Sequence, residues 1–469
     1  MPAKTFRQKF IGDRAFYKMV LYIAVPIVVQ NGITNLVNLL DNVMVGQLGT
    51  EAMSGVAIAN QLMFVFNLCI FGGLSGAGIF CAQFHGSGNA DGVRQTFRFK
   101  LLVAFGLCAV FLTAFLTRDT ELLSLYLHQS ESGGDLLYTL QEGRRYLRIM
   151  LLGLIPFALN NVYITTLRET GETLLPMKAG VTAVLVNLVF NWLLIFGHLG
   201  FPEMGAAGAA AATVLSRYIE LFIVVGWTHR HKEKNRFIQG VYRSLRISRP
   251  VYTSILRKGW PLLLNEVLWS IGMTTITQCY SVRGLSAVAA VNIASTLANL
   301  FKIVMMAAGN AIAIIVGNRL GAGRMEEARD IDNKMIFATC ALCALIGLVL
   351  LGVAPLFPAM YNTTDEVRAL ATVFLRITAC VLPLQAFNNA CYFTLRAGGK
   401  TFITFIFDSM FVWCVSLPPA LYASRMTAMP VIAMYAMVQA LDMVKTAIGF
   451  MLVKRGSWLS NIVVDGGRK

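Results

Sequence analysis

The chain has 469 residues, of which 56% are hydrophobic and only 14% are charged, and its formal net charge at pH 7 is +16. Because a soluble domain averages about 25% charged residues, this composition excludes an ordinary soluble protein and predicts an integral membrane protein. The positive charge does not indicate a nucleic-acid partner, since no soluble domain carries it.

Apolar stretches long enough to cross a bilayer recur along the whole chain. The hydrocarbon core requires about 20 apolar residues in a helix, and twelve stretches reach or approach this length. They lie roughly at residues 20–44, 55–81, 99–117, 146–167, 177–199, 205–228, 260–282, 287–317, 335–358, 370–395, 402–423 and 430–453. The sequence therefore predicts an all-α membrane protein with twelve transmembrane helices, six in each half.

The basic residues predict how these helices are oriented. With twelve crossings, most of the 40 Lys and Arg residues fall in the termini and the even-numbered loops. Loops rich in Lys and Arg face the cytoplasm. We therefore expect a multi-pass protein of the cell membrane with both termini in the cytoplasm, and with anionic lipid as a partner at that face.

The first predicted span carries a polar stripe. Between residues 30 and 41, polar side chains recur every three or four positions, among them Asn35, Asn38 and Asp41, so they share one helix face. A charged residue within a membrane is a functional-site hypothesis by default, and Asp41 could accept a proton or a sodium ion. At ~1.5 Å per residue Asp41 also lies near the outer boundary, where a hydrated helix end would explain it equally well.

The linker between the halves is basic. We expect an N-terminal lobe at residues 1–235 and a C-terminal lobe at 236–469, joined by a cytoplasmic segment at 229–258. Part of this segment, at 237–247, could lie as an amphipathic helix on the inner membrane surface or form a solvated loop. We expect the protein to act as a monomer.

The second half carries more charge within its predicted spans than the first half. Glu266, Asp408, Asp442 and Lys445 fall at similar depths, roughly 12–18 Å from the inner face at 1.5 Å per residue, and Lys302 lies near the middle of the eighth span. These groups could form one network, because an unpaired buried charge is very costly. Two hypotheses remain open: a switch made by Glu266, Lys302 and Asp408, or a permanently paired network that holds helices together.

The two halves are copies of one design. Three segments of the first half recur in the second: 49–59 as 284–294, 86–88 as 321–323, and 160–168 as 388–396. We interpret the glycines of the second pair of segments as tight turns. Because each half has an even number of spans, both halves enter the membrane from one side. A pseudo-two-fold axis along the membrane normal should then relate two six-helix lobes, a plan common in transporters.

No sequence motif supplies an energy source. The chain contains neither a GxxxxGK[S/T] nucleotide loop nor a TVGYG potassium filter. We therefore expect no enzymatic activity and no cofactor, and transport would have to run on an ion gradient.

Motifs at the ends of three predicted spans indicate a family. Asp41-Asn-Val-Met-Val-Gly46-Gln-Leu-Gly49 ends the first span, and Leu167-Arg168 and Leu395-Arg396-Ala-Gly-Gly-Lys follow the fourth and tenth spans. With two six-span halves, the chain resembles the multidrug and toxin extrusion (MATE) family over nearly its whole length. The resemblance implies a V-shaped pair of lobes and the export of small organic, often cationic, compounds in exchange for H⁺ or Na⁺.

The resemblance also implies residue roles in the first lobe. Asp41 matches the family's first-span aspartate, which is implicated in ion coupling. Asn187 and Asn191 fall in the fifth-span motif, but Asn191 stands where many members have a second aspartate. Hydrogen bonding between helices also explains this asparagine pair.

In the second lobe, Glu266 resembles the seventh-span acid that is linked to sodium binding in some members. The tenth-span aspartate of those members has no match, since Gln385 or Asn388 lies nearby. Apart from Na⁺ at Glu266 we expect no metal site, and the coupling ion stays open between H⁺ and Na⁺. A related flippase for a lipid-linked saccharide is the alternative function, and a structural role without transport is a third.

Overall fold

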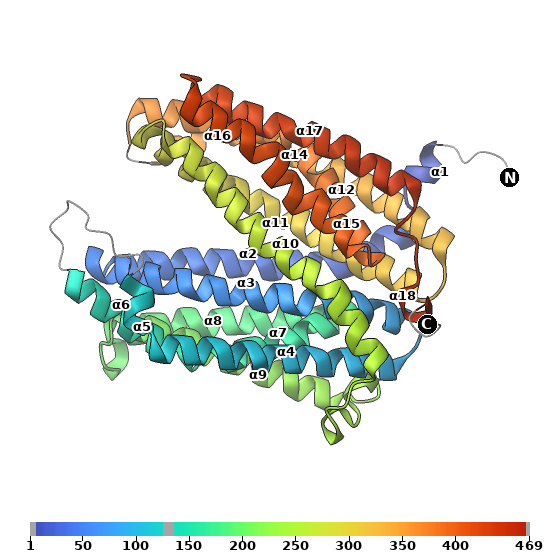
Figure 1. Ribbon diagram of the computed structural model, residues 1–469. Coiled ribbons are helices and arrows are strands. Elements are labelled where there is room, and N and C mark those ends of the chain that lie inside the picture. Colours follow the sequence, from blue (N-terminus) through green and yellow to red (C-terminus); the bar gives the residue numbers. More distant parts are fainter. Residues whose placement is uncertain (1–5, 125–135, 362, 466–469) are drawn as a thin grey trace. The chain divides into compact units, whose positions relative to one another are not determined.

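Long helices make up most of the structure (Figure 1). The computed structural model describes residues 6–124, 136–361 and 363–465, and within these ranges it contains no β-strand. The chain divides into two compact units. Unit 1 comprises Met1–Val28, Ala82–Asn89 and Ser254–Lys469, and unit 2 comprises Val29–Cys81 and Ala90–Thr253. The lobe boundary expected at residues 235 and 236 stays a prediction.

Unit 2 contains the later part of α2 and the helices up to α9. Their bounds are α2 (Arg14–Gly46), α3 (Thr50–Gly86), α4 (Ala90–Thr117), α5 (Asp119–Ser124), α6 (Leu136–Leu151), α7 (Leu154–Glu169), α8 (Leu174–Phe196), the 3₁₀ turn η1 (His198–Gly200) and α9 (Ala206–Arg230). In this unit α8 packs along α9, and α4 packs along α7 (Figure 1). Helices α6 and α7 are bent by 49° against each other, and taken together they are long and apolar enough to cross a membrane.

The basic linker is folded against unit 2. It forms two short 3₁₀ turns, η2 (Arg236–Ile238) and η3 (Val241–Arg243), in which Phe237, Ile238 and Val241 are buried. The Arg98 guanidinium of α4 donates to the backbone oxygens of Gly240, Val241 and Arg246 at 3.0, 2.9 and 3.0 Å. The segment forms 3₁₀ turns and not the amphipathic helix, and Gln239, Tyr242, Arg243, Leu245 and Arg246 are exposed. Buried apolar side chains and one arginine hold it.

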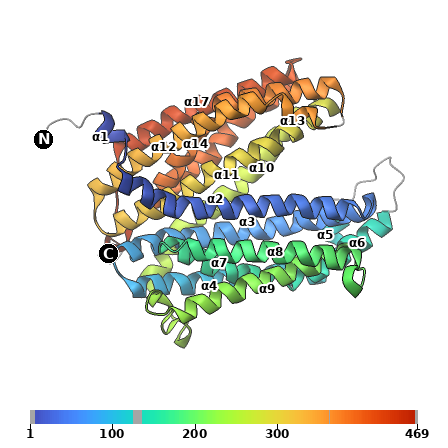
Figure 2. The ribbon, with the colours of Figure 1, turned by 180° about the vertical axis from the view of Figure 1, so that it is seen from behind.

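Unit 1 contains α1, the first part of α2 and all helices from α10 onward. Their bounds are α1 (Phe6–Phe10), α10 (Arg249–Ser281), α11 (Leu285–Gly321), α12 (Met325–Val353), α13 (Leu356–Ala359), α14 (Asp365–Ala397), α15 (Thr401–Phe405), the π-helical stretches η4 (Ile406–Met410) and η5 (Val412–Ser416), α16 (Leu417–Met426), α17 (Val431–Arg455) and α18 (Ile462–Asp465). Helix α14 is central and packs against α11, α12 and α17. Figure 2 shows the start of α2 beside α12, where Phe16, Ile23 and Ile27 join the core of this unit.

The all-helical membrane fold is confirmed, but the count of twelve spans is matched only approximately. Among the described residues, ten helices are long and apolar enough to cross a membrane, and the bent pair of α6 and α7 makes eleven. The segment expected at 260–282 lies within α10, a helix of 33 residues that is not among them. Asn265 and Glu266 near the middle of α10 reduce its apolar character.

The turns at 86–88 and 321–323 show the repeat in three dimensions within unit 1. Gly88 and Gly323 have φ of +73° and +75°, the conformation of tight turns that favours glycine. A Cβ atom on Gly86 would lie 1.9 Å from the backbone oxygen of Asn318, and one on Gly321 would lie 1.9 Å from that of Gln83. Gln83 corresponds to Asn318 as Gly86 does to Gly321, so the two contacts are exchanged by a local two-fold relation.

Candidate functional site

Asp41 lies five residues before the end of α2 and is partly buried in unit 2. Asn191 of α8 donates from Nδ2 to Asp41 Oδ1. With its amide nitrogen toward α2, Asn187 lies 3.0 Å from the same oxygen, and Thr213 of α9 donates to the Asn187 oxygen at 3.2 Å. Asp41 forms no ion pair with any side chain that the structure describes. A carboxyl group held only by neutral amides can change its charge without leaving a buried cation unpaired.

The rest of the polar stripe on α2 is not gathered around Asp41. Asn35 Nδ2 donates at 2.8 Å to the backbone oxygen of Asn31 in its own helix and is exposed. The side chain of Asn38 lies outside the described residues. Gln30 accepts from Arg168, the arginine of the repeated Leu-Arg motif. The sequence predicts that Gln30, Asn35 and Asp41 share one helix face. Of these three side chains, Asp41 is the one that hydrogen-bonds to the asparagines of α8.

Glu266 of α10 also has a neutral partner. The Tyr392 hydroxyl of α14 donates to Glu266 Oε1 at 3.1 Å. Arg396, one turn farther along α14, is close enough to Glu266 for an electrostatic interaction. Sequence reasoning missed Tyr392, and the signal was its place one turn before the repeated Leu-Arg motif. This carboxyl group therefore has a hydroxyl donor and a nearby cation within one unit.

Asp408 is ion-paired. It lies in the π-helical stretch η4, and its Oδ1 is 2.7 Å from Lys445 Nζ of α17, with exposed fractions of 16% and 11%. Asn265 of α10 donates to the other Asp408 oxygen at 3.1 Å. The Lys445 ammonium also lies 5.2 Å from the centre of the Phe407 ring, in range for a cation–π contact. Both charges of the pair thus have several partners.

The other two charges of the predicted network, Asp442 and Lys302, lie on α17 or interact with it. Gln385 Nε2 donates to Asp442 at 3.3 Å and to Gln439 at 2.9 Å. Asn388 Nδ2 donates to the Asp442 backbone oxygen at 3.2 Å. Lys302 of α11 has Asp442 as its electrostatic neighbour. In this structure Asp408 pairs with Lys445 rather than Lys302, and whether these charges switch partners stays a prediction.

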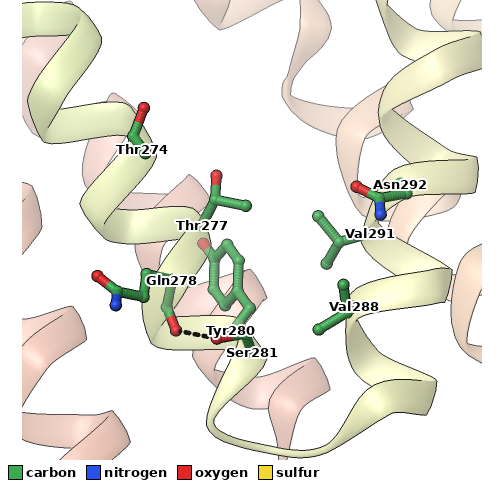
Figure 3. Close-up of a pocket in the computed structure, with 8 residues that line it drawn as sticks. All are labelled: Thr274, Thr277, Gln278, Tyr280, Ser281, Val288, Val291 and Asn292. Carbon is green, nitrogen blue, oxygen red and sulfur yellow. Dashed lines mark hydrogen bonds between the residues drawn. The ribbon is translucent and has the colours of Figure 1, made fainter. Parts of the chain in front are cut away.

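A pocket opens between the adjoining ends of α10 and α11 in unit 1 (Figure 3). Its volume is about 500 Å³, and its lining is uncharged: Thr274, Thr277, Gln278, Tyr280, Ser281, Val288, Val291 and Asn292. The Ser281 hydroxyl donates to the Gln278 backbone oxygen at 2.7 Å, so its own lone pairs face outward as acceptors. Sequence reasoning missed this pocket, although the spacing of the hydroxyl residues on α10 placed them on one face. Drug-sized ligands occupy pockets of about 300–1,000 Å³.

Comparisons with known proteins agree on one family. The sequence model of the MatE family matches residues 26–193 and 261–421. The probable multidrug resistance protein NorM of Thermotoga maritima is 24% identical over 86% of this chain and 84% of its own length. The probable multidrug resistance protein YoeA of Bacillus subtilis is 23% identical over 88% of each chain. A solved outward-facing multidrug resistance MATE family transporter of the MOP superfamily matches 98% of this chain and 99% of its own with a TM-score of 0.84 at 20% identity, which shows the fold.

Proposed function

This chain belongs to the MatE family, a family of membrane transporters, and we propose that it exports small organic compounds in exchange for H⁺ or Na⁺. The relatives in Thermotoga maritima and Bacillus subtilis carry the name of multidrug resistance proteins. We infer drug-like substrates for this chain from those names. Alternating access between its two lobes would carry the substrate outward.

The observation that carries the proposal is the surroundings of Asp41. Its carboxyl group contacts the amides of Asn187 and Asn191. Binding of one cation neutralises such a group, and release of the cation restores its charge. Exchange of that kind links substrate export to an ion gradient, whereas Asp408 already has Lys445 as its counter-charge.

H⁺ suits this site better than Na⁺. Sodium prefers several oxygen ligands, and Asn191 is turned with its nitrogen toward Asp41. Proton uptake needs only one carboxyl oxygen, so we propose H⁺ as the coupling ion and keep Na⁺ at Glu266 as the alternative.

We propose that substrates touch unit 1 at the pocket of Figure 3. Its hydroxyl and amide oxygens would accept hydrogen bonds from a substrate, while Tyr280, Val288 and Val291 offer apolar surface. Because the pocket carries no charge, it would admit substrates that differ in charge and shape. Replacing Gln278 or Asn292 by alanine should raise KM for some substrates more than for others and leave kcat nearly unchanged.

Two features of the surroundings remain expectations. We propose that the protein acts as a monomer, because the repeat supplies both lobes in one chain. The exposed basic residues of the linker, such as Arg243 and Arg246, would face anionic lipid headgroups at the cytoplasmic surface.

The proposal can be tested with the purified protein in liposomes. Export of a fluorescent organic cation is followed after imposing either a pH gradient or a sodium gradient. We expect transport to follow the pH gradient and to stop when a protonophore collapses it. Dependence on sodium alone would assign Na⁺ as the ion, and transport without any gradient would contradict antiport. Movement of a lipid-linked saccharide across the same vesicles, without dye export, would favour the flippase alternative.

A further inference from the structure

A short segment after α17 folds back over the end of unit 1. Gly456, with φ of +67°, ends α17 and reverses the chain direction. We call residues 457–462 the strap. Within it Trp458 is 1% exposed, and its Nε1 donates to the Val453 backbone oxygen at 3.1 Å. A Cβ atom on Gly398 would lie 2.0 Å from the Trp458 backbone oxygen, so only glycine lets the strap lie flat on the end of α14.

Gln83, from the last turn of α3, holds the strap. Its side chain is fully buried, and its Nε2 donates to the backbone oxygens of Ala397 at 2.9 Å and Ser460 at 3.3 Å. Its Oε1 accepts from the backbone nitrogen of Ile462 at 2.9 Å. One amide thus binds both the strap and the end of α14, and its hydrogen bonds to them go to main-chain atoms.

The strap also reaches the second turn of the repeat. Asn461 Nδ2 donates to the Gly321 backbone oxygen at 3.0 Å, and Gly321 is packed on Gln83. Asn318, which corresponds to Gln83, donates at 2.7 Å to the Ile314 backbone oxygen of its own helix. The strap therefore lies where the two turns meet, and Gln83 of the first-half turn binds it.

The turn at residues 82–89 connects two helices that belong mostly to unit 2, so movement of these helices would act on the contact between Gln83 and the strap. Residues 82–89 are held in unit 1, whereas α3 before them and α4 after them belong to unit 2. Helix α3 is continuous through residues 82–86. Movement of the part of α3 that precedes residue 82 during alternating access would therefore pull directly on Gln83. A contact made of main-chain hydrogen bonds and glycine packing can separate and re-form without exposing a charge.

We propose that the strap and Gln83 form a latch that must release once in every transport cycle. The proposal rests on the transport activity proposed above. While the latch is engaged, the turn at 82–89 stays packed against α11 and the strap. When it releases, this end of unit 1 opens, and the strap re-engages to return the protein to the described state.

A disulfide can lock the turn. A Cβ atom on Gly317 would lie 3.1 Å from Cβ of Ala82, close to the spacing of about 3.5–4.5 Å found in disulfides. We expect A82C/G317C, made in a background with Cys81→Ala, to stop export when oxidised and to recover it on reduction. Equal export by oxidised and reduced protein, with cross-linking complete, would overturn the latch. Export by the reduced protein tests the transport proposal separately, so the two failures can be told apart.

A second experiment tests the strap itself and does not depend on transport. I462P removes the N–H that donates to Gln83, at a helix start where proline is tolerated. S460A is the matched control, because it removes the hydroxyl bond to Gly398 and keeps both bonds to Gln83. With A82C as the only cysteine, I462P should speed maleimide labelling at least about fivefold, because it removes both the N–H that binds Gln83 and the Ile462 side chain that packs on Gly399, while S460A should not. Equal labelling of I462P and the unmodified strap would refute the role of the strap.

Discussion

Two acids within the predicted spans, Asp41 of unit 2 and Asp408 of unit 1, differ in what surrounds them. Asp41 in unit 2 contacts asparagine amides, whereas Asp408 in unit 1 is paired with Lys445 and also receives a hydrogen bond from Asn265. One duplicated scaffold can thus hold two kinds of carboxyl group. One can gain or lose a cation at little structural cost, and the other must keep its charge because a buried ammonium depends on it.

The largest effect is expected when the charge of Asp41 is removed. Asp41→Asn should reduce gradient-driven export to the level of empty liposomes, because no group remains to exchange the ion. The free energy of unfolding should change by about 1 kcal/mol or less, since the new amide oxygen still accepts from Asn191. Dye export and thermal unfolding in detergent measure both quantities. Normal export by a folded variant would remove Asp41 from the coupling mechanism.

At the ion pair between Asp408 and Lys445 we expect a large loss of stability, in contrast to the small one at Asp41. Asp408→Ala leaves Lys445 without its counter-charge and should cost about 3–5 kcal/mol in the free energy of unfolding. The matched control is the double variant Asp408→Leu with Lys445→Met, which should recover most of that loss because neither partner of the pair is left as an unpaired charge. If the double variant is as unstable as the single one, packing rather than charge explains the position.

Glu266, like Asp408, lies in unit 1, and its surroundings can be compared with those of both acids. Its hydrogen bond from the Tyr392 hydroxyl resembles the amide contacts of Asp41 more than the lysine contact of Asp408. We expect Glu266→Gln to slow export while lowering stability by about 1–2 kcal/mol, since the amide oxygen still accepts from Tyr392 but the electrostatic interaction with Arg396 is lost. Unchanged export together with a clear loss of stability would assign Glu266 to a structural network.

The smallest effect is expected at an ion pair outside the membrane spans. Asp119 of α5 lies 2.7 Å from Arg144 and 3.1 Å from Arg148, whose side chains are 43% and 56% exposed. Burial raises the pKa of Asp119, but hydrogen bonds from Arg144 and Thr120 outweigh it and lower that pKa to about 2. Its contribution to stability is therefore complete above the unfolded pKa of about 3.9 and disappears as the pH falls through the folded value.

Asp119→Asn should accordingly lower the unfolding free energy at pH 6 by no more than about 1 kcal/mol, because the arginines remain hydrated. The difference from the parent protein should shrink as the pH falls from about 4 toward 2. Glu121→Gln, which breaks the exposed pair with Arg118, is the control and should have no measurable effect. A difference that grows at low pH would contradict the assigned direction.

The sequence predicted the helical membrane fold and the repeat because both depend on local patterns. Hydropathy identifies a span within a window of about 20 residues, and the copied motifs need only alignment. The count of twelve spans was matched only approximately. Helices α6 and α7 are bent against each other, and α10 is too polar to be recognised as a span.

The partners of the charged residues could not be predicted in the same way. From depth along the helices, either Lys302 or Lys445 could pair with Asp408. Which lysine forms the pair depends on how α17 is rotated against the π-helical stretch η4. The contact between Asp41 and Asn191 likewise depends on how α2 packs on α8. The strap was not predicted at all, because Gln83 binds main-chain atoms there, which have no sequence signature.

The exchange of contacts between Gly86 and Gly321 bears on how such a chain could arise. In a symmetric dimer an isologous interface makes every contact twice, so a single glycine in an unduplicated six-helix ancestor would have satisfied both close approaches at once. After gene fusion the two copies were free to diverge. Glycine stayed at both positions, while the neighbouring site became Gln83 in one copy and Asn318 in the other. A homodimer of the second half alone would then keep both close glycine contacts and carry Asn318 in place of Gln83, so residues 457–462 would lose the hydrogen bonds that Gln83 makes to them.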